Sequence, residues 1–134
     1  MNVKEDMQKK IMEFQILDTN LKMLQERAEM VSQKLEDLQR TKVAIEELKG
    51  TKPNKALVPL GSGNFVYGNI ENCEDVIVGV GSDVAIKKKR EKVLEVLDSR
   101  IKEVEDNLNA ILKQSSLFVA QLEKLQQEVE SLQK

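Results

Sequence analysis

The sequence predicts a mostly α-helical protein with a small β part, in which two long helices form an antiparallel coiled coil and are joined by two β-hairpins. All six glycines and both prolines of the 134-residue chain lie between positions 50 and 81. On either side of this segment, apolar residues recur at alternating spacings of three and four. We therefore divide the chain into a helix over 1–49, two hairpins within 50–88 and a helix over 89–134.

The composition agrees with long helices exposed to water. Charged residues make up 33% of the chain and aromatic residues 3%, which is typical of coiled coils rather than of globular cores. The formal net charge of −2 gives no overall attraction for nucleic acid or an anionic membrane. Cys73 is the single cysteine, which fits a reducing compartment. Since no secretory or membrane-spanning segment is recognisable, we expect a cytoplasmic protein without a membrane or nucleic-acid partner.

The first helix has an apolar seam that lysine interrupts twice, at Lys10 and Lys42. Asn2 followed by Glu5 predicts a capping box at its start, and Lys49-Gly50 predicts its end. A spacing of 3.5 residues predicts a left-handed coiled coil. The apolar seam residues are Met7, Phe14, Leu17, Leu21, Leu24, Ala28, Val31, Leu35, Leu38 and Ile45.

The central segment reads as two successive hairpins. Short runs rich in β-branched residues are separated by "GSG", "ENCED" and "GSD", and "VPLGS" at 58–62 repeats as "VGVGS" at 78–82. Pro59 predicts an edge or a bulge. The strands are apolar on both faces, so we expect other subunits to cover them. The predicted interface residues are Leu57, Val58, Leu60, Phe65, Val66, Val76, Ile77, Val78 and Val80.

The second helix has the clearer seam, in which Ser115 is the single polar position. An antiparallel pairing that sets Ile45 opposite Leu94 also sets Met7 opposite Leu132, so both termini meet at one end. Ala28 and Ser115 make the seam thinnest near mid-length. The seam positions are Leu94, Leu97, Ile101, Val104, Leu108, Ile111, Ser115, Phe118, Leu122, Leu125, Val129 and Leu132.

Catalysis and cofactor binding are not favoured. The loop at Gly61 and Gly63 lacks the Lys-Ser/Thr of a phosphate-binding loop and precedes a strand, so we interpret it as a turn rather than a nucleotide site. The chain has no histidine, and Cys73 has no basic partner in the pattern, so neither an enzyme nor a metal site is expected. "KKKREK" at 87–92 is interpreted as a solvated shoulder between the last strand and the second helix, with nucleic acid or an acidic patch on a neighbouring subunit as alternatives.

This order of elements, with "LVPLGSGNFVYGNI" and "VIVGVGSDVAIKK" at the hairpins, resembles the alpha-class subunit of prefoldin. The two hairpins indicate the alpha class, because beta-class subunits have one. Asp83 stands where many relatives have glycine, and aspartate tolerates the same backbone angles. The resemblance implies a hexamer of two alpha and four beta subunits with a β-barrel body. It also implies coiled-coil tips that hold unfolded polypeptides without ATP and pass them to a group II chaperonin.

The candidate client-binding residues lie at the end where the termini meet. Packing within the coil is the alternative for each of them, whereas apolar residues off the seam would be partly exposed there. Three functions remain open: a chaperone subunit, a structural or filament-forming coiled coil without client transfer, and a nucleic-acid binder. The candidate residues are Met7, Ile11, Met12, Phe14, Ile16, Leu122, Leu125, Val129 and Leu132.

Overall fold

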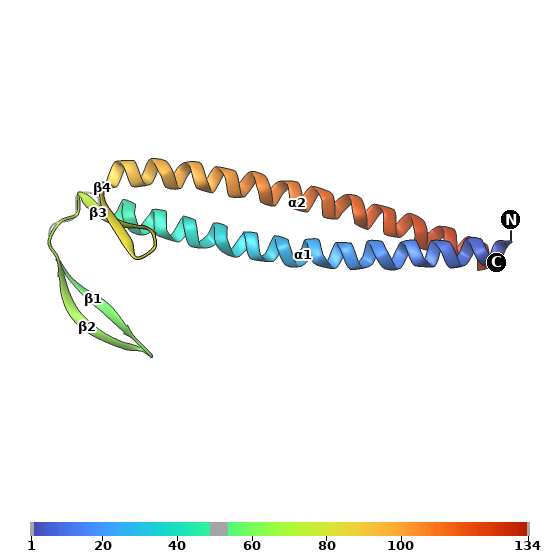
Figure 1. Cartoon of the computed structure of the whole chain (residues 1–134), viewed down its shortest axis with the longest axis horizontal. Coiled ribbons are helices and arrows are strands. Elements are labelled where there is room, and N and C mark those ends of the chain that lie inside the picture. Colours follow the sequence, from blue (N-terminus) through green and yellow to red (C-terminus); the bar gives the residue numbers. More distant parts are fainter. Residues whose placement is uncertain (1, 49–53, 134) are drawn as a thin grey trace. The chain divides into compact units, whose positions relative to one another are not determined.

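The computed structural model describes residues 2–48 and 54–133, and it confirms the predicted fold class of two long helices and two antiparallel hairpins (Figure 1). The predicted helix end at Lys49-Gly50 lies outside the described residues. None of the helices in the described part is long and apolar enough to cross a membrane. The elements in chain order are α1 (Val3–Glu47), β1 (Asn54–Gly61), β2 (Asn64–Ile70), β3 (Asp75–Gly81), β4 (Val84–Lys89) and α2 (Arg90–Gln133).

The chain forms two compact units. The first contains Met1–Leu35 and Glu103–Lys134, so it holds the beginning of α1 and the end of α2 side by side (Figure 1). The second contains Glu36–Lys102, which is the end of α1, both hairpins and the beginning of α2.

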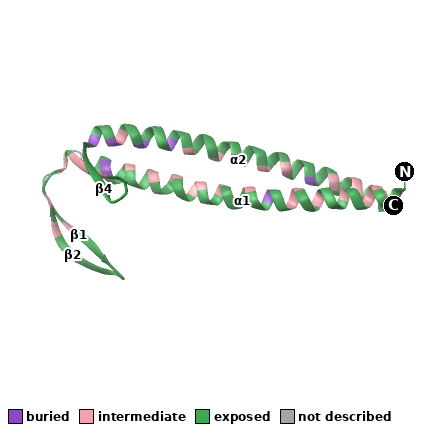
Figure 2. Cartoon of the chain, viewed as in Figure 1, coloured by how far each residue is buried: buried purple, intermediate pink, exposed green. Residues whose placement is uncertain are grey.

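The predicted seam is confirmed in both units. Every seam position named above is buried or half-buried, and these residues follow the sides of α1 and α2 that face each other (Figure 2). Burial of such a stripe is what stabilises helices of this length, because their polar remainder gains little from folding. The most buried seam residues are Leu21, Ile45, Leu97, Ile101, Ile111 and Leu122.

The two lysines that interrupt the seam each form an ion pair across it. Lys42 Nζ lies 2.7 Å from Asp98 Oδ1 in the second unit, and Lys10 Nζ lies 2.6 Å from Glu128 Oε2 in the first. Both pairs agree with the register that places Ile45 opposite Leu94. A lysine can keep its aliphatic stem in the seam while its ammonium group reaches a carboxylate at the edge. A shifted register would separate the charges, so the pairs favour this alignment over others.

The start of α1 is capped by a side chain, as the sequence predicts. The backbone N–H of Lys4 donates to Asn2 Oδ1 at 3.1 Å, and the N–H of Asp6 donates to the Asn2 carbonyl oxygen at 3.1 Å. The side-chain bond satisfies the Lys4 N–H, which has no partner inside the helix, and the backbone bond is the first of the helical ladder. The structure thus shows Asn2 as the N-cap, which is the first half of the predicted capping box.

The two hairpins repeat one geometry, which explains the repeat of 20 residues in the sequence. β1 pairs with β2 and β3 with β4, each as a separate two-stranded antiparallel sheet. In each hairpin the register shifts just before the turn, between Pro59 and Gly61 and again between Gly79 and Gly81. Pro59 thus lies beside a bulge, as expected from its missing N–H group.

Both turns require left-handed backbone, which explains their residue types. Ser62 and Gly63 have φ of 53° and 79°, and Ser82 and Asp83 have φ of 51° and 60°. Two consecutive positive φ angles match the twist of the flanking strands in a two-residue hairpin. Asp83 adopts the conformation that glycine would otherwise supply, at a modest cost for this residue type.

The second hairpin packs against the helix ends of its own chain. Ile45, Val93 and Leu97 form a buried cluster, against which Val76 and Val78 of β3 pack. Arg90, which is buried, donates from its NH1 nitrogen to the Cys73 carbonyl oxygen at 2.6 Å, and its backbone N–H donates to the Glu74 carbonyl oxygen at 2.8 Å. These contacts attach the start of β3 to the start of α2.

The basic run does not form a shoulder between strand and helix. Lys87, Lys88 and Lys89 belong to β4, and α2 begins directly at Arg90. Lys89 Nζ lies 3.1 Å from Asp75 Oδ1 and Lys87 Nζ lies 3.7 Å from Asp75 Oδ2. Since β3 and β4 are antiparallel and Asp75 is opposite Lys89, part of this positive charge is paired within the hairpin.

Acid should destabilise the fold through two carboxylates. The Asn72 side chain and Lys89 lower the pKa of Asp75 below its usual 3.8, and the hydrogen bond from Lys10 lowers the pKa of Glu128 below its usual 4.5. Their stabilising contributions are present above the unfolded-state values and are lost as pH falls through the folded-state values. We expect the Tm followed by circular dichroism to fall below about pH 5.

The variant that tests this assignment is Asp75→Asn combined with Glu128→Gln, which removes both carboxylates and keeps the size of the side chains. It should have a lower Tm than the parent at neutral pH and a shallower decline in acid. Parallel pH curves for the two proteins would contradict this assignment.

Candidate functional site

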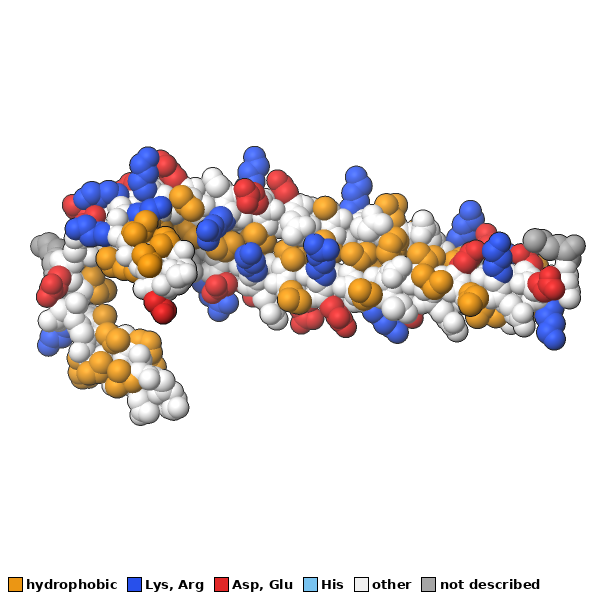
Figure 3. Space-filling view, viewed as in Figure 1, with side chains coloured by type: hydrophobic (Ala, Val, Ile, Leu, Met, Phe, Trp, Pro, Cys, Tyr) orange, Lys and Arg blue, Asp and Glu red, His pale blue; other side chains and the backbone are white. Residues whose placement is uncertain are grey.

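The first hairpin presents an apolar surface on both faces. Cross-strand pairing sets Leu57 opposite Tyr67 and Val58 opposite Val66, so the two pairs project to opposite sides of the sheet. The exposed fractions of Leu57 and Tyr67 are 60% and 81%. The exposed apolar cluster is visible on this hairpin in Figure 3. Its residues are Leu57, Val58, Leu60, Phe65, Val66 and Tyr67.

The second hairpin divides the predicted interface residues between two environments. Ile77 and Val80 are exposed, whereas Val76 and Val78 are half-buried against the helix ends. For Val76 and Val78, at least part of the cover therefore comes from the chain's own helices rather than from another subunit. Periodicity within β3 alone cannot reveal this, because the helix ends that cover it are distant in sequence.

Sequence reasoning missed three apolar residues on the hairpins. Tyr67, Val84 and Ile86 are exposed but were not among the expected interface residues. Ile86 lies opposite Val78, and Tyr67 lies opposite Leu57. Treating each hairpin as two paired strands would have identified Tyr67 and Ile86, because apolar cross-strand pairs share one face, whereas Val84 is paired with Gly81.

The residues predicted to bind clients lie in the first unit and fall into two groups. Met7, Phe14, Leu125, Val129 and Leu132 are half-buried in the seam, and Leu122 is buried. Three others lie off the seam with exposed side chains, namely Ile11, Met12 and Ile16. Lys10 and Glu128 join the two helices among these residues. The structure therefore combines a closed seam with apolar side chains exposed beside it.

The apolar surface continues along α1 beyond the predicted residues. Met23 and Met30 are 62% and 72% exposed, and they follow Ile16 at intervals of seven residues. Met23 also lines a shallow depression with Leu24 and Phe118. The seven-residue spacing of Ile16, Met23 and Met30 is visible in the sequence, but Met23 and Met30 were not predicted as functional residues because they lie off the seam.

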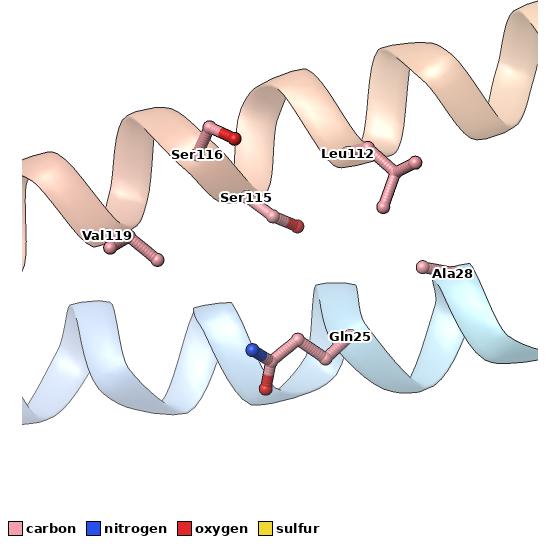
Figure 4. Close-up of a pocket in the computed structure, with 6 residues that line it drawn as sticks. All are labelled: Gln25, Ala28, Leu112, Ser115, Ser116 and Val119. Carbon is pink, nitrogen blue, oxygen red and sulfur yellow. The ribbon is translucent and has the colours of Figure 1, made fainter.

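An open depression of about 510 Å³ lies beside the seam where Ala28 and Ser115 were predicted to make it thin, and part of its lining, including Leu112 and Val119, is exposed. Figure 4 shows Ser115 on the side of α2 that faces α1, whereas the Gln25 side chain lies along α1. The Ser115 hydroxyl oxygen is buried and finds no hydrogen-bond partner within residues 2–48 and 54–133. A serine buries little apolar area at this seam position, so the seam is weaker here than at its leucine and isoleucine positions.

The loop at Gly61 and Gly63 remains a turn in the structure. It connects β1 directly to β2, and it opens no helix whose N-terminal N–H groups could hold a phosphate. The interpretation as a hairpin turn is confirmed.

Comparisons with known proteins converge on one family. A family model described as "Prefoldin subunit" matches residues 17–134. The prefoldin subunit alpha of Methanobrevibacter smithii is 30% identical over 90 residues, which are 67% of this chain. The matched region spans 62% of that relative's length.

Two solved structures share the fold. Filamentous PFD from Methanocaldococcus jannaschii has a TM-score of 0.70 at 20% identity, with 85% of this chain and 95% of that chain covered. The prefoldin beta subunit from Thermococcus strain KS-1 has a TM-score of 0.69 at 18% identity, with 97% and 94% covered. At these identities, the likeness concerns the arrangement of helices and hairpins.

The exposed face of β3 provides a test of association through the hairpins. Replacing Ile77 with aspartate places a charge on this face but leaves the cluster around Val78 intact. If another subunit covers Ile77, burying the unpaired carboxylate should weaken association by about 2–5 kcal/mol. Sedimentation velocity should then show a smaller species than the parent forms.

The control is Met30→Asp, which changes an equally exposed apolar residue on α1. It should sediment like the parent, and circular dichroism should show parental helix content for both variants. Parental sedimentation of Ile77→Asp would exclude this face from the interface.

Proposed function

Because the chain belongs to the prefoldin subunit family, we propose that it is an alpha-class co-chaperone subunit that acts without ATP. It captures unfolded polypeptides at the end of the coiled coil where residues 3–16 of α1 and 122–133 of α2 lie together. It then passes them to a group II chaperonin. The proposed location is the cytoplasm, where both non-native chains and such a chaperonin would be met.

The observation that carries this proposal is the group of exposed apolar side chains beside the seam at this end. Met12 and Ile16 are 65% and 60% exposed, and Ile11 is 40% exposed. An unfolded chain offers apolar segments of many shapes, and flexible methionine and isoleucine side chains can adapt to them. The half-buried seam residues next to them, such as Phe14, would add surface when a segment binds.

Affinity in this arrangement depends on several subunits acting together. Burial of apolar area contributes roughly 25 cal/mol per Å², so a few side chains at one end bind a segment weakly. When several ends engage one polypeptide, the later contacts become intramolecular and the overall affinity rises. The function therefore requires assembly.

The hairpins are the proposed site of that assembly. We propose a hexamer of two alpha and four beta subunits, whose hairpins combine into a β-barrel body. The apolar cluster on both faces of β1 and β2 supports this, because the chain's own hairpin cannot cover both sides. The likeness of the fold to a prefoldin beta subunit is compatible with the two subunit types sharing one body.

A second candidate function is a self-assembling filament without client transfer. The structural neighbour from Methanocaldococcus jannaschii is a filamentous form, and exposed hairpins could equally join identical subunits. Mixing the chain with a candidate beta subunit separates the two, because native mass spectrometry would show either a closed complex with both subunits or an open series of masses.

Removing the ends tests client capture. Deleting residues 1–12 together with 126–134 should leave assembly intact, because about four heptads of seam and both hairpins remain. It should reduce the suppression of aggregation when a denatured client is diluted from denaturant, as followed by light scattering. Mass measurement of the complex confirms that it has assembled.

Beta-subunit ends could retain part of the activity, so the deletion is made in a complex whose beta ends are also shortened. The control complex is shortened only in its beta subunits. If both complexes suppress aggregation equally well, the ends of this chain do not hold clients. Client binding would then have to be sought along the rest of the coiled coil or on the hairpins.

A further inference from the structure

The end of the first unit that holds the candidate client-binding residues also contains an ion pair across the seam. Lys10 Nζ donates to Glu128 Oε2 at 2.6 Å, and the side chains are 26% and 34% exposed. Lys10 occupies the seam position between Met7 and Phe14, and Glu128 directly precedes the seam residue Val129. The pair therefore lies among the residues that would contact a client.

The ion pair holds the helices together by charge and hydrogen bonding, whereas the neighbouring seam residues do so by apolar burial. An apolar residue at the position of Lys10 would keep the seam closed by burial alone, and leaving the seam would expose it to water. A lysine and a glutamate can each exchange their partner for water at little cost when they are partly exposed. Separating the two helices at Lys10 is thus easier than at an apolar position. The separation would expose the buried parts of the Met7 and Phe14 side chains.

Both groups are charged near neutral pH, so the contact persists until the helices separate. The hydrogen bond to Glu128 raises the pKa of Lys10 above its usual 10.5, and the bond from Lys10 lowers the pKa of Glu128 below its usual 4.5.

We propose that Lys10 and Glu128 form a latch that keeps this end of the coiled coil closed and that must release for a client segment to reach the seam. In the closed state, the half-buried surfaces of Phe14, Leu125 and Val129 are shared between the two helices. In the released state, the same surfaces are offered to an apolar segment of an unfolded chain. This inference rests on the proposed capture of clients at this end.

The chain supplies a matched control in the second unit. Lys42 also interrupts the seam, and its Nζ lies 2.7 Å from Asp98 Oδ1, with a further contact to Glu46 at 3.7 Å. Its surroundings differ, because the buried cluster of Ile45, Val93 and Leu97 follows it directly. Breaking this pair changes the charge across the seam in the same way, but away from the candidate client-binding residues.

The first test measures opening. Glu128→Lys places two positive charges opposite each other, whereas Lys10→Glu combined with Glu128→Lys restores an ion pair with its direction reversed. Amide hydrogen exchange of residues 7–14 and 122–132 should be about 2- to 5-fold faster in the single variant, as expected for a partly exposed pair. The double variant should exchange more slowly than the single one, close to the parent.

The second test measures capture with the complete complex. If the latch limits access, less Glu128→Lys complex than parent complex should be needed for half-suppression of client aggregation, by about 2- to 5-fold. The double variant should require the parental amount. Asp98→Lys should also require the parental amount, although exchange becomes faster around residue 42.

The outcomes separate the latch from the proposed function. Unchanged exchange in Glu128→Lys overturns the latch, and so does faster exchange without improved capture. Equal improvement by Asp98→Lys would show that general loosening is responsible, which also overturns it. If the parent complex fails to suppress aggregation at all, the proposal of client capture is wrong, and the latch proposal, which rests on it, is wrong as well.

Discussion

The antiparallel seam between α1 and α2 is the interaction on which the other features of this protein depend. Helices of 45 and 44 residues with so few aromatic residues have no globular core to pack against. They are stable because each buries one narrow apolar stripe against the other, layer by layer. The same pairing sets the beginning of α1 beside the end of α2 in one unit and the start of α2 beside the end of α1 in the other.

Three polar residues interrupt the apolar seam, and each changes how the two helices pack. Lys10 and Lys42 reduce the apolar area of the seam, but each selects its partner across it and so fixes the register. Ser115 and the small Ala28 lie in neighbouring layers of the seam and line an open depression at mid-length. A seam that was apolar throughout would bury more apolar area, but it would have fewer contacts that specify one register.

Most of the fold follows from the sequence because periodic patterns report local structure directly. The seam positions, the cap at Asn2 and the turns at Gly63 and Asp83 all depend on residues close together in sequence, and all are confirmed. The environment of Val78 could not be predicted in this way, because it depends on packing against Ile45 and Leu97. The pairing of Lys87 and Lys89 with Asp75 was not predicted for a similar reason, since it is a contact between strands.

A distance between two spin labels measures whether the two helices of one chain pair antiparallel in this register. Labels at Gln8→Cys and Glu130→Cys, both exposed positions near the paired ends, would be introduced with Cys73→Ser and measured by pulsed electron resonance. Antiparallel pairing within one chain predicts a separation of about 25 Å or less, given the spacing of packed helices, and this distance should persist when labelled chains are diluted with unlabelled ones. A separation near the full helix length of about 65 Å, or a short distance that disappears on dilution, would contradict it.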